Sequence, residues 1–136
     1  MTAETKRVTL TWREGMIFGG GEPGGPTAVV DADNATAPGP MLHLLLAAAS
    51  CTASDVLLIL RKMRLAPREL RIEAAGTRRE EEPRRYTAIH FAYHLSGDGI
   101  DEARARRAID LSLEKYCSVI NSLAPDIRIT YALALG

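Results

Sequence analysis

The stretch LLLAAASCTASDV, Leu44–Val56, lies within a segment that contains no glycine or proline from Met41 to about Arg64. Pro40 directly precedes the segment, and proline suits the first turn of a helix. Basic residues close it, where they complement the negative end of a helix dipole. At a rise of about 1.5 Å per residue, such a helix crosses a whole small domain. The sequence therefore predicts one long central helix.

This segment is also long enough to test as a membrane span, which needs about 20 predominantly apolar residues. Polar side chains interrupt it at His43, Ser50, Thr52, Ser54 and Asp55. The pattern favours a central, largely buried helix of a soluble protein.

Strand patterns surround this helix on both sides. Val8, Leu10 and Trp12 alternate with threonines, which is typical of a strand with one apolar face. The expected strands are Arg7–Trp12, Thr27–Val30, Glu69–Arg78, Arg84–Leu95 and Ile127–Leu135, with glycine-rich or irregular loops at residues 19–26 and 31–40. We expect a single α+β domain over residues 1–136, with the long helix packed on an antiparallel sheet.

A second long helix is predicted after the Gly97-Asp98-Gly99 break, with Asp101 as its N-cap. An amphipathic stripe follows at helical spacing: Ala105, Ala108, Ile109, Ser112, Leu113 and Tyr116. Cys117 lies at the end of this helix, beside the stripe.

The composition is that of an ordinary soluble protein, with 46% hydrophobic and 25% charged residues. Seventeen basic residues balance seventeen acidic ones, so we expect no general affinity for nucleic acid or anionic membranes. The first residues do not resemble a secretory signal. We therefore expect a cytoplasmic protein, in a reducing compartment where structural disulfides are rare.

Several kinds of site are disfavoured by spacing. The run GGGEPGGP, Gly19–Pro26, matches neither common phosphate-loop pattern. Ser50, His43 and Asp55 lie on one predicted helix without the GxSxG motif of a serine hydrolase. His90 and His94 lie on one strand face without a third ligand, so we expect no metal site.

The two cysteines, Cys51 and Cys117, are the remaining candidates for chemistry. No CxxC spacing is present, which excludes zinc-ribbon and thioredoxin-type motifs. Each cysteine lies on, or at the end of, a helix with a buried face. The residues alone leave two interpretations open: two inert buried thiols or one redox pair.

Two blocks of the sequence, GPMLHLLLAAASCTASDVLLILRKMR and AIDLSLEKYCSVINSL, resemble the OsmC/Ohr family, and within it the YhfA-like branch. The resemblance extends from GMIFGG at Gly15–Gly20 through the last strand. It implies an OsmC-like fold with the first cysteine on the central helix and the second at the end of the second long helix. It also implies an intertwined homodimer, which would cover a central helix that is apolar on nearly every side.

The resemblance implies a thiol peroxidase. Cys51 would attack a hydroperoxide and become a sulfenic acid, and Cys117 would condense with it to a disulfide. An external dithiol, of the lipoyl type, would reduce that disulfide, and no bound cofactor is implied. Leu44, Leu45 and Phe18 could form a pocket that favours organic hydroperoxides.

A reactive thiolate needs a nearby cation, and Arg13 is the candidate for the arginine that the peroxidase branches supply from their N-terminal region. Those branches orient the arginine with a glutamate at the position of Met41 here, and YhfA-like relatives commonly carry glutamate at the position of Leu42. Neither acid is present. Asp55, one turn after Cys51, is interpreted as a structural carboxylate with an ion-pair or hydrogen-bond partner in an adjoining loop.

Two further functions stay open from the sequence. One is a non-catalytic dimer that binds a small ligand or acts in a stress response, with the cysteines as core residues. The other is a thiol redox sensor that forms a disulfide without peroxidase turnover.

Overall fold

The computed structural model describes residues 2–136. The chain divides into two compact units, the first ending at Leu44 and the second beginning at Leu45. The expectation of a single domain stays a prediction.

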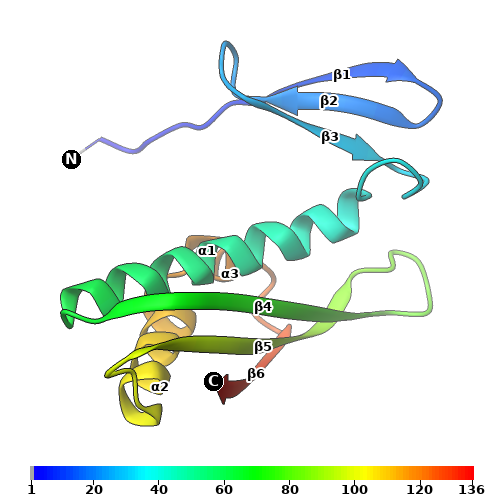
Figure 1. Ribbon diagram of the computed structural model, residues 1–136. Coiled ribbons are helices and arrows are strands. Elements are labelled where there is room, and N and C mark those ends of the chain that lie inside the picture. The colour runs from blue at the N-terminus through cyan, green and yellow to red at the C-terminus, as the bar shows by residue number, and fades with distance from the viewer. Residues whose placement is uncertain (1) are drawn as a thin grey trace. The chain divides into compact units, whose positions relative to one another are not determined.

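The first unit is an antiparallel meander of three strands, β1 (Thr9–Glu14), β2 (Ile17–Gly21) and β3 (Thr27–Asp31). Figure 1 shows these strands in blue and cyan. Gly15 adopts a φ of 51° in the tight turn between β1 and β2, a conformation that favours glycine.

The strand β2 was not predicted, because its glycines were interpreted as a loop. Gly20 and Gly21 pair with Leu10 and Thr9 of β1. A Cβ atom on Gly20 would lie 2.9 Å from the Thr9 carbonyl oxygen, and one on Gly21 would collide with the Pro26 carbonyl. Glycine therefore allows the close backbone approach that this strand requires.

The predicted irregular loop after β3 is present, and Asp31 organises it. Its carboxylate accepts hydrogen bonds of 2.9–3.1 Å from the backbone N–H groups of Asp33, Ala35 and Thr36 and from the Thr36 hydroxyl. These bonds, the Thr36 N–H first among them, hold the pKa of the Asp31 carboxyl below its usual value.

The long helix α1 (Pro40–Lys62) begins in the first unit and continues into the second, as the proline-to-basic pattern predicted. Its buried residues lie on one face at helical spacing: Leu45, Ala48, Thr52, Val56 and Leu60. The expectation of a largely buried helix is wrong for the single chain, since Leu46 and Leu58 are each 54% exposed. By length and composition α1 could also cross a membrane, a test that core helices of soluble proteins pass too.

The second unit contains the sheet β4 (Ala66–Arg78), β5 (Tyr86–Asp98) and β6 (Arg128–Leu135), in that order. Between β5 and β6 lie α2 (Glu102–Leu111), the π-helical turn η1 (Ser112–Tyr116) and α3 (Ser118–Asn121). Asp101 caps α2 by accepting a hydrogen bond of 2.8 Å from the Arg104 N–H, which confirms the predicted N-cap. The fold is α+β, as predicted.

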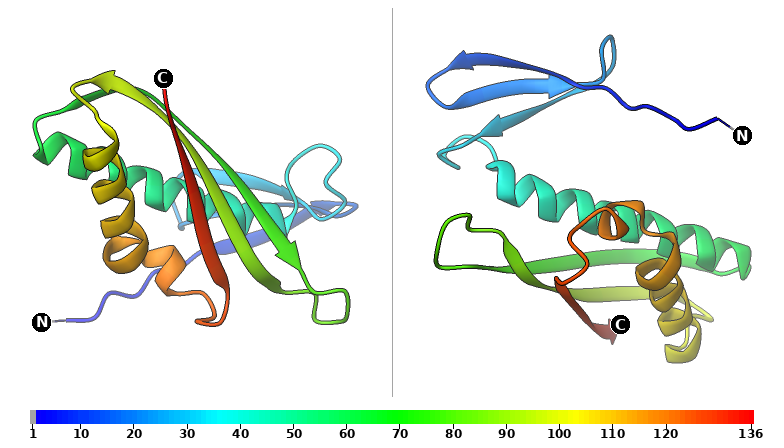
Figure 2. Two further views of the ribbon diagram at one scale, coloured as in Figure 1. Left: turned by 90° about the horizontal axis from the view of Figure 1, so that it is seen from below. Right: turned by 180° about the vertical axis from the view of Figure 1, so that it is seen from behind.

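One correction concerns the sheet, which was expected to be antiparallel. β4 and β5 are antiparallel, but β5 and β6 run parallel. The physical reason is the helical connection between them, because a parallel partner requires a long crossover back to the start of the neighbouring strand. Figure 2 shows this crossover from two sides.

The core of the second unit lies between this sheet and the helices. β5 contributes Ile89, Phe91, Tyr93 and Leu95, all buried, on the alternate positions that the sequence predicted as one face. Tyr93 stacks edge-on against Tyr131 of β6, with ring centroids 5.8 Å apart. Tyr93 bonds to α1 and Tyr131 to α2, so both helices pack on this face.

A second correction concerns the second long helix. It was expected to run to Cys117, but regular α-helix ends at Leu111 and a π-helical turn follows. The Cys117 N–H donates to the Ser112 carbonyl at 2.7 Å and closes that turn. Single π turns of this kind are frequent at functional sites.

Candidate functional site

The structure brings the two cysteines together from different elements. Cys51 lies in the middle of α1 and is half-buried, whereas Cys117 lies between η1 and α3 and is fully buried. Their sulfur atoms and a carboxylate oxygen of Asp55 all lie within 4.8 Å of one another. Both cysteines are free thiols, and their sulfurs are not at the distance of about 2.05 Å that a disulfide requires.

The two elements fix these positions by simple geometry. Cys51 and Asp55 are four residues apart on α1, so their side chains lie one above the other on the same face. Cys117 is the N-cap of α3, and its sulfur accepts a hydrogen bond of 3.5 Å from the Ile120 N–H. The π turn therefore ends with the Cys117 side chain directed at α1.

A chain of buried hydrogen bonds lies behind these groups. The Ser112 hydroxyl donates to Asp55 Oδ2 at 2.9 Å. Ser112 Oγ also lies 2.7 Å from Thr52 Oγ1, which in turn lies 2.9 Å from the Tyr93 hydroxyl. Thr52, Ser112 and Tyr93 are essentially unexposed.

The direction of this chain follows from counting protons. Ser112 has one hydroxyl proton and gives it to Asp55, so it accepts from Thr52. Thr52 then accepts from the Tyr93 hydroxyl. All three hydroxyl dipoles point toward the Asp55 carboxylate, which is thereby oriented beside the two sulfurs.

Burial dominates the electrostatics of the site. It raises the pKa of the Cys117 thiol to about 11, and the neighbouring Cys51 and Asp55 act in the same direction. Burial also raises the pKa of the Tyr93 hydroxyl to about 12. Cys117 is therefore a protonated thiol at neutral pH. Cys51 is the more solvent-accessible of the two cysteines.

Asp55 does have a hydrogen-bond partner, as predicted, but the partner is Ser112 in the π turn and not a residue of a loop. The roles of Thr52, Ser112 and Tyr93 were missed. The available signal was Ser112, a polar residue on the otherwise apolar stripe of the second helix. A buried hydroxyl at such a position needs a partner, and here the partners come from α1.

The other residues of the sequence predictions lie elsewhere. Arg13, on β1, packs its guanidinium over Gly19, where a Cβ atom would collide with it. Arg13 belongs to the first unit and both cysteines to the second, so its role beside Cys51 stays a prediction. Met41 and Leu42 form part of the first turn of α1, which carries no acidic residue.

The residues of the disfavoured serine triad are engaged separately. His43 Nε2 bonds to the Val29 carbonyl at 3.0 Å, and the Ser50 hydroxyl donates to the Ala47 carbonyl at 3.1 Å. Asp55 accepts from Ser112. The three side chains therefore do not form a hydrolase triad in the structure.

The two strand histidines each have a local partner. His90 Nδ1 bonds to the Thr130 hydroxyl at 2.7 Å, and His94 Nε2 lies 3.8 Å from a Glu73 carboxylate oxygen. Neither belongs to the cysteine cluster.

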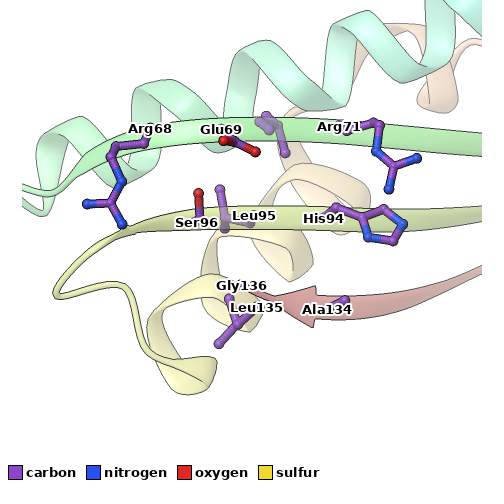
Figure 3. Close-up of a pocket in the computed structure, with 10 residues that line it drawn as sticks. Arg68, Glu69, Arg71, His94, Leu95, Ser96, Ala134, Leu135 and Gly136 are labelled. Carbon is purple, nitrogen blue, oxygen red and sulfur yellow. The ribbon is translucent and has the colours of Figure 1, made fainter.

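A pocket of about 520 Å³ lies away from the cysteines, lined by the start of β4 and the ends of β5 and β6 (Figure 3). Its basic side chains already have acidic partners. Arg68 bonds to Asp98 at 2.7 Å, and Arg71 is paired with Glu73. These pairs leave little positive charge for an anionic ligand, so the cysteine cluster is the stronger candidate site.

The chain is similar to known proteins over nearly its full length. Residues 32–132 match the family described as OsmC-like protein. The protein YhfA of Escherichia coli (strain K12) is 38% identical over 124 residues, which cover 90% of this chain and 92% of YhfA.

Solved structures share the fold at lower identity. The crystal structure of an OsmC-like protein from Mycoplasma pneumoniae matches with a TM-score of 0.84 and 17% identity, covering 98% of this chain and 99% of that one. An organic hydroperoxide resistance protein OsmC from Legionella pneumophila matches with a TM-score of 0.69 and 11% identity, covering 98% and 99%. At these identities the likeness establishes the fold alone.

Proposed function

The chain belongs to the OsmC-like protein family, and on that premise we propose that it is a cysteine-based peroxidase that reduces organic hydroperoxides. The observation that carries the proposal is the cluster in which the Cys51 and Cys117 sulfurs lie within 4.8 Å of each other. The name of the Legionella pneumophila relative, an organic hydroperoxide resistance protein, supports the choice of substrate.

The proposed cycle begins at the accessible thiol. The Cys51 thiolate attacks one peroxide oxygen, the O–O bond breaks, and the other oxygen leaves with a proton as the alcohol. The sulfenic acid on Cys51 then condenses with the Cys117 thiol, which forms the S–S bond and releases one water. The exposure of the two cysteines supports this order, since Cys51 is the one within reach of a substrate.

An external dithiol closes the cycle. One of its thiolates attacks the disulfide, and its second thiol releases the mixed disulfide, so that both cysteines are reduced and the dithiol is oxidised. A lipoyl-type dithiol has this chemistry. The protein itself needs no bound cofactor for these steps, and we propose that it acts in the reducing cytoplasm.

The proposal assigns the activation of Cys51 to Arg13, whose guanidinium would stabilise the thiolate. Leu44, Leu45 and Phe18 would contribute apolar surface to the substrate pocket. Because Met41 and Leu42 replace the family's glutamates, Arg13 would have to be held by other contacts, and its packing over Gly19 is one of them.

The test is a count of free thiols. Incubation of the reduced protein with cumene hydroperoxide should remove two thiols per chain and produce a Cys51–Cys117 disulfide that mass spectrometry identifies. Dihydrolipoamide should restore both thiols and sustain further peroxide consumption. A protein that retains both thiols would contradict the proposed function.

We also propose that two copies form an intertwined homodimer. The apolar face predicted for the strand Arg7–Trp12 supports it, because Val8, just before β1, and Leu10 and Trp12, on β1, are 77%, 61% and 65% exposed in the single chain. Leu46 and Leu58 on α1 add further exposed apolar surface. Large apolar side chains that are exposed in this way, on each of the two units, are typical of protein interfaces.

Sedimentation equilibrium should therefore give twice the chain mass of 14.8 kDa. Leu58→Glu should raise the dimer dissociation constant by roughly 100-fold or more, because a carboxylate would be buried without a partner. Glu81→Gln, at the exposed hairpin tip, is the control and should leave the mass unchanged. A wild-type protein with the mass of one chain would contradict the dimer.

A further inference from the structure

We infer that Cys51, Asp55 and Cys117 form a binding site for a thiophilic divalent cation, with Zn²⁺ as the best match to the ligand atoms. The inference does not rest on the proposed peroxidase activity, because it concerns the reduced protein without peroxide. The sequence pattern pointed only to His90 and His94 as possible metal ligands, and both have partners outside this cluster.

The spacing of the three donor atoms fits this cation. Zn–S bonds of about 2.3 Å and Zn–O bonds of about 2.0–2.2 Å in a tetrahedron place neighbouring donors roughly 3.4–3.8 Å apart. The two sulfurs and the Asp55 oxygen already lie within 4.8 Å of one another. Small side-chain rotations are therefore enough to close the site around an ion.

The positions of the three ligands on the helices also support a metal site. Cys51 and Asp55 lie at i and i+4 on α1, the spacing that places two ligands on one helix face. Cys117 approaches from the start of α3, in a segment 66 residues from Cys51 by sequence number. Three protein ligands leave a fourth position for water, as in catalytic zinc sites.

The surrounding hydrogen bonds orient two of the three ligands. Ser112 donates to Asp55 Oδ2, and Thr52 and Tyr93 stand behind Ser112 in the buried chain. The Ile120 N–H donates to the Cys117 sulfur. Hydrogen bonds from a second layer of residues hold metal ligands in place and commonly contribute 10–100-fold to affinity.

The charges of the ligands select the cation. Two thiolates and a carboxylate would repel one another, and a divalent cation at their centre offsets two of their three negative charges. Soft sulfur ligands favour Zn²⁺ or Cd²⁺ over Mg²⁺ and Ca²⁺, which prefer oxygen. Binding exchanges the two thiol protons for the metal and involves no oxidation, since a coordinated thiol is deprotonated. A metal held by both sulfurs would block their joining as a disulfide.

The test is a titration of the reduced, full-length protein with Cd²⁺ and with Zn²⁺ under anaerobic conditions. Calorimetry should give one ion per chain, and Cd²⁺ should produce the ultraviolet absorption band of cadmium thiolates. Cys51→Ser and Cys117→Ser should each weaken binding by about 100-fold or more. Asp55→Asn should weaken it by about 10–100-fold while it keeps the thiolate band.

Asp110→Asn is the matched carboxylate control, because Asp110 bonds to Tyr131 outside the cluster, and His90→Ala is the control for histidine ligation. Both should bind Cd²⁺ as the wild type does. Circular dichroism should confirm that each variant is folded. The inference is overturned if the wild type binds no stoichiometric ion, if either serine variant binds as tightly as the wild type, or if Asp55→Asn has no effect. The titration contains no peroxide. A protein that binds no metal could therefore still lose two thiols to cumene hydroperoxide, and the two tests can fail separately.

Discussion

Cys51→Ser should abolish hydroperoxide reduction, while Cys117→Ser should consume one peroxide per chain and then stop. The loss in the first variant should be roughly 1,000-fold or more, the scale seen when an enzyme loses its nucleophile. A serine hydroxyl at its ordinary pKa is a poor nucleophile, and it cannot form a sulfenic acid. In the second variant Cys51 can still be oxidised, but no thiol is available to resolve it.

The measurement is stopped-flow consumption of cumene hydroperoxide, with dimedone trapping of the sulfenic acid. Cys117→Ser should accumulate a dimedone adduct on Cys51, whereas the wild type should form little of it, because Cys117 resolves the sulfenic acid before dimedone reacts. This substitution should fold, because serine is a good N-cap and can accept the Ile120 N–H in place of the sulfur. Ser50→Ala, one residue before Cys51 and exposed, is the control and should react as the wild type does.

The outcome separates the proposed peroxidase from the two other functions. A wild type that forms the disulfide rapidly but is not recycled by any dithiol would indicate a redox sensor. Equal, slow reaction in the wild type and in Cys51→Ser would indicate a non-catalytic dimer with core cysteines. Either result would contradict the peroxidase.

The elements with local signals could be predicted from the sequence. Pro40 marks the start of α1 and the alternation in β5 marks its buried face. β2 could not be predicted, because its glycines are needed where the backbones of neighbouring segments come close to it. That requirement arises from the pairing of β2 with its neighbours and leaves no pattern within residues 17–21 themselves. The residue types at Ser112–Tyr116 are equally compatible with a continuing α-helix. The π turn therefore has no local signal in the sequence and depends on tertiary packing.

The candidate site was predictable only in part, for the same reason. Cys51 and Cys117 could be paired by family resemblance, since no local pattern links positions so far apart in the sequence. Asp55 was recognised one turn after Cys51, but its partner Ser112 lies in the π turn within the crossover between β5 and β6. Thr52 and Tyr93 each lie on an apolar face, where the sequence alone offers no sign that two hydroxyls meet.

The largest effect on stability is expected from a substitution of Thr52, whose hydroxyl lies between those of Tyr93 and Ser112. Thr52→Val keeps the shape of the side chain but removes the hydroxyl between Tyr93 and Ser112. The Tyr93 hydroxyl would then be buried without an acceptor, and Ser112 would lose its donor. Because an unsatisfied buried polar group costs about 1–3 kcal/mol, the free energy of unfolding should fall by about 2–4 kcal/mol.

Tyr93→Phe should cost less, about 0.5–1.5 kcal/mol from the lost hydrogen bond, apart from any change in packing. Thr52 would lose one incoming bond but would keep its donation to Ser112. The double variant should be more stable than the sum of the single effects predicts, because the hydroxyl that Thr52→Val leaves unpaired is then absent.

Urea unfolding measures the free energy of unfolding of the wild type, the two single variants and the double variant, which together form a double-mutant cycle. All four are measured at one protein concentration, because self-association would otherwise shift the apparent stability. The control is Ser54→Ala: the Ser54 hydroxyl donates to the Ser50 carbonyl on the exposed side of α1, so its loss should change the free energy of unfolding by no more than about 0.5 kcal/mol. Strict additivity of Thr52→Val and Tyr93→Phe would contradict the directed hydrogen-bond chain. Coupling of the expected sign would show that the Tyr93 and Thr52 hydroxyls depend on each other, as a chain directed through Ser112 to the Asp55 carboxylate requires.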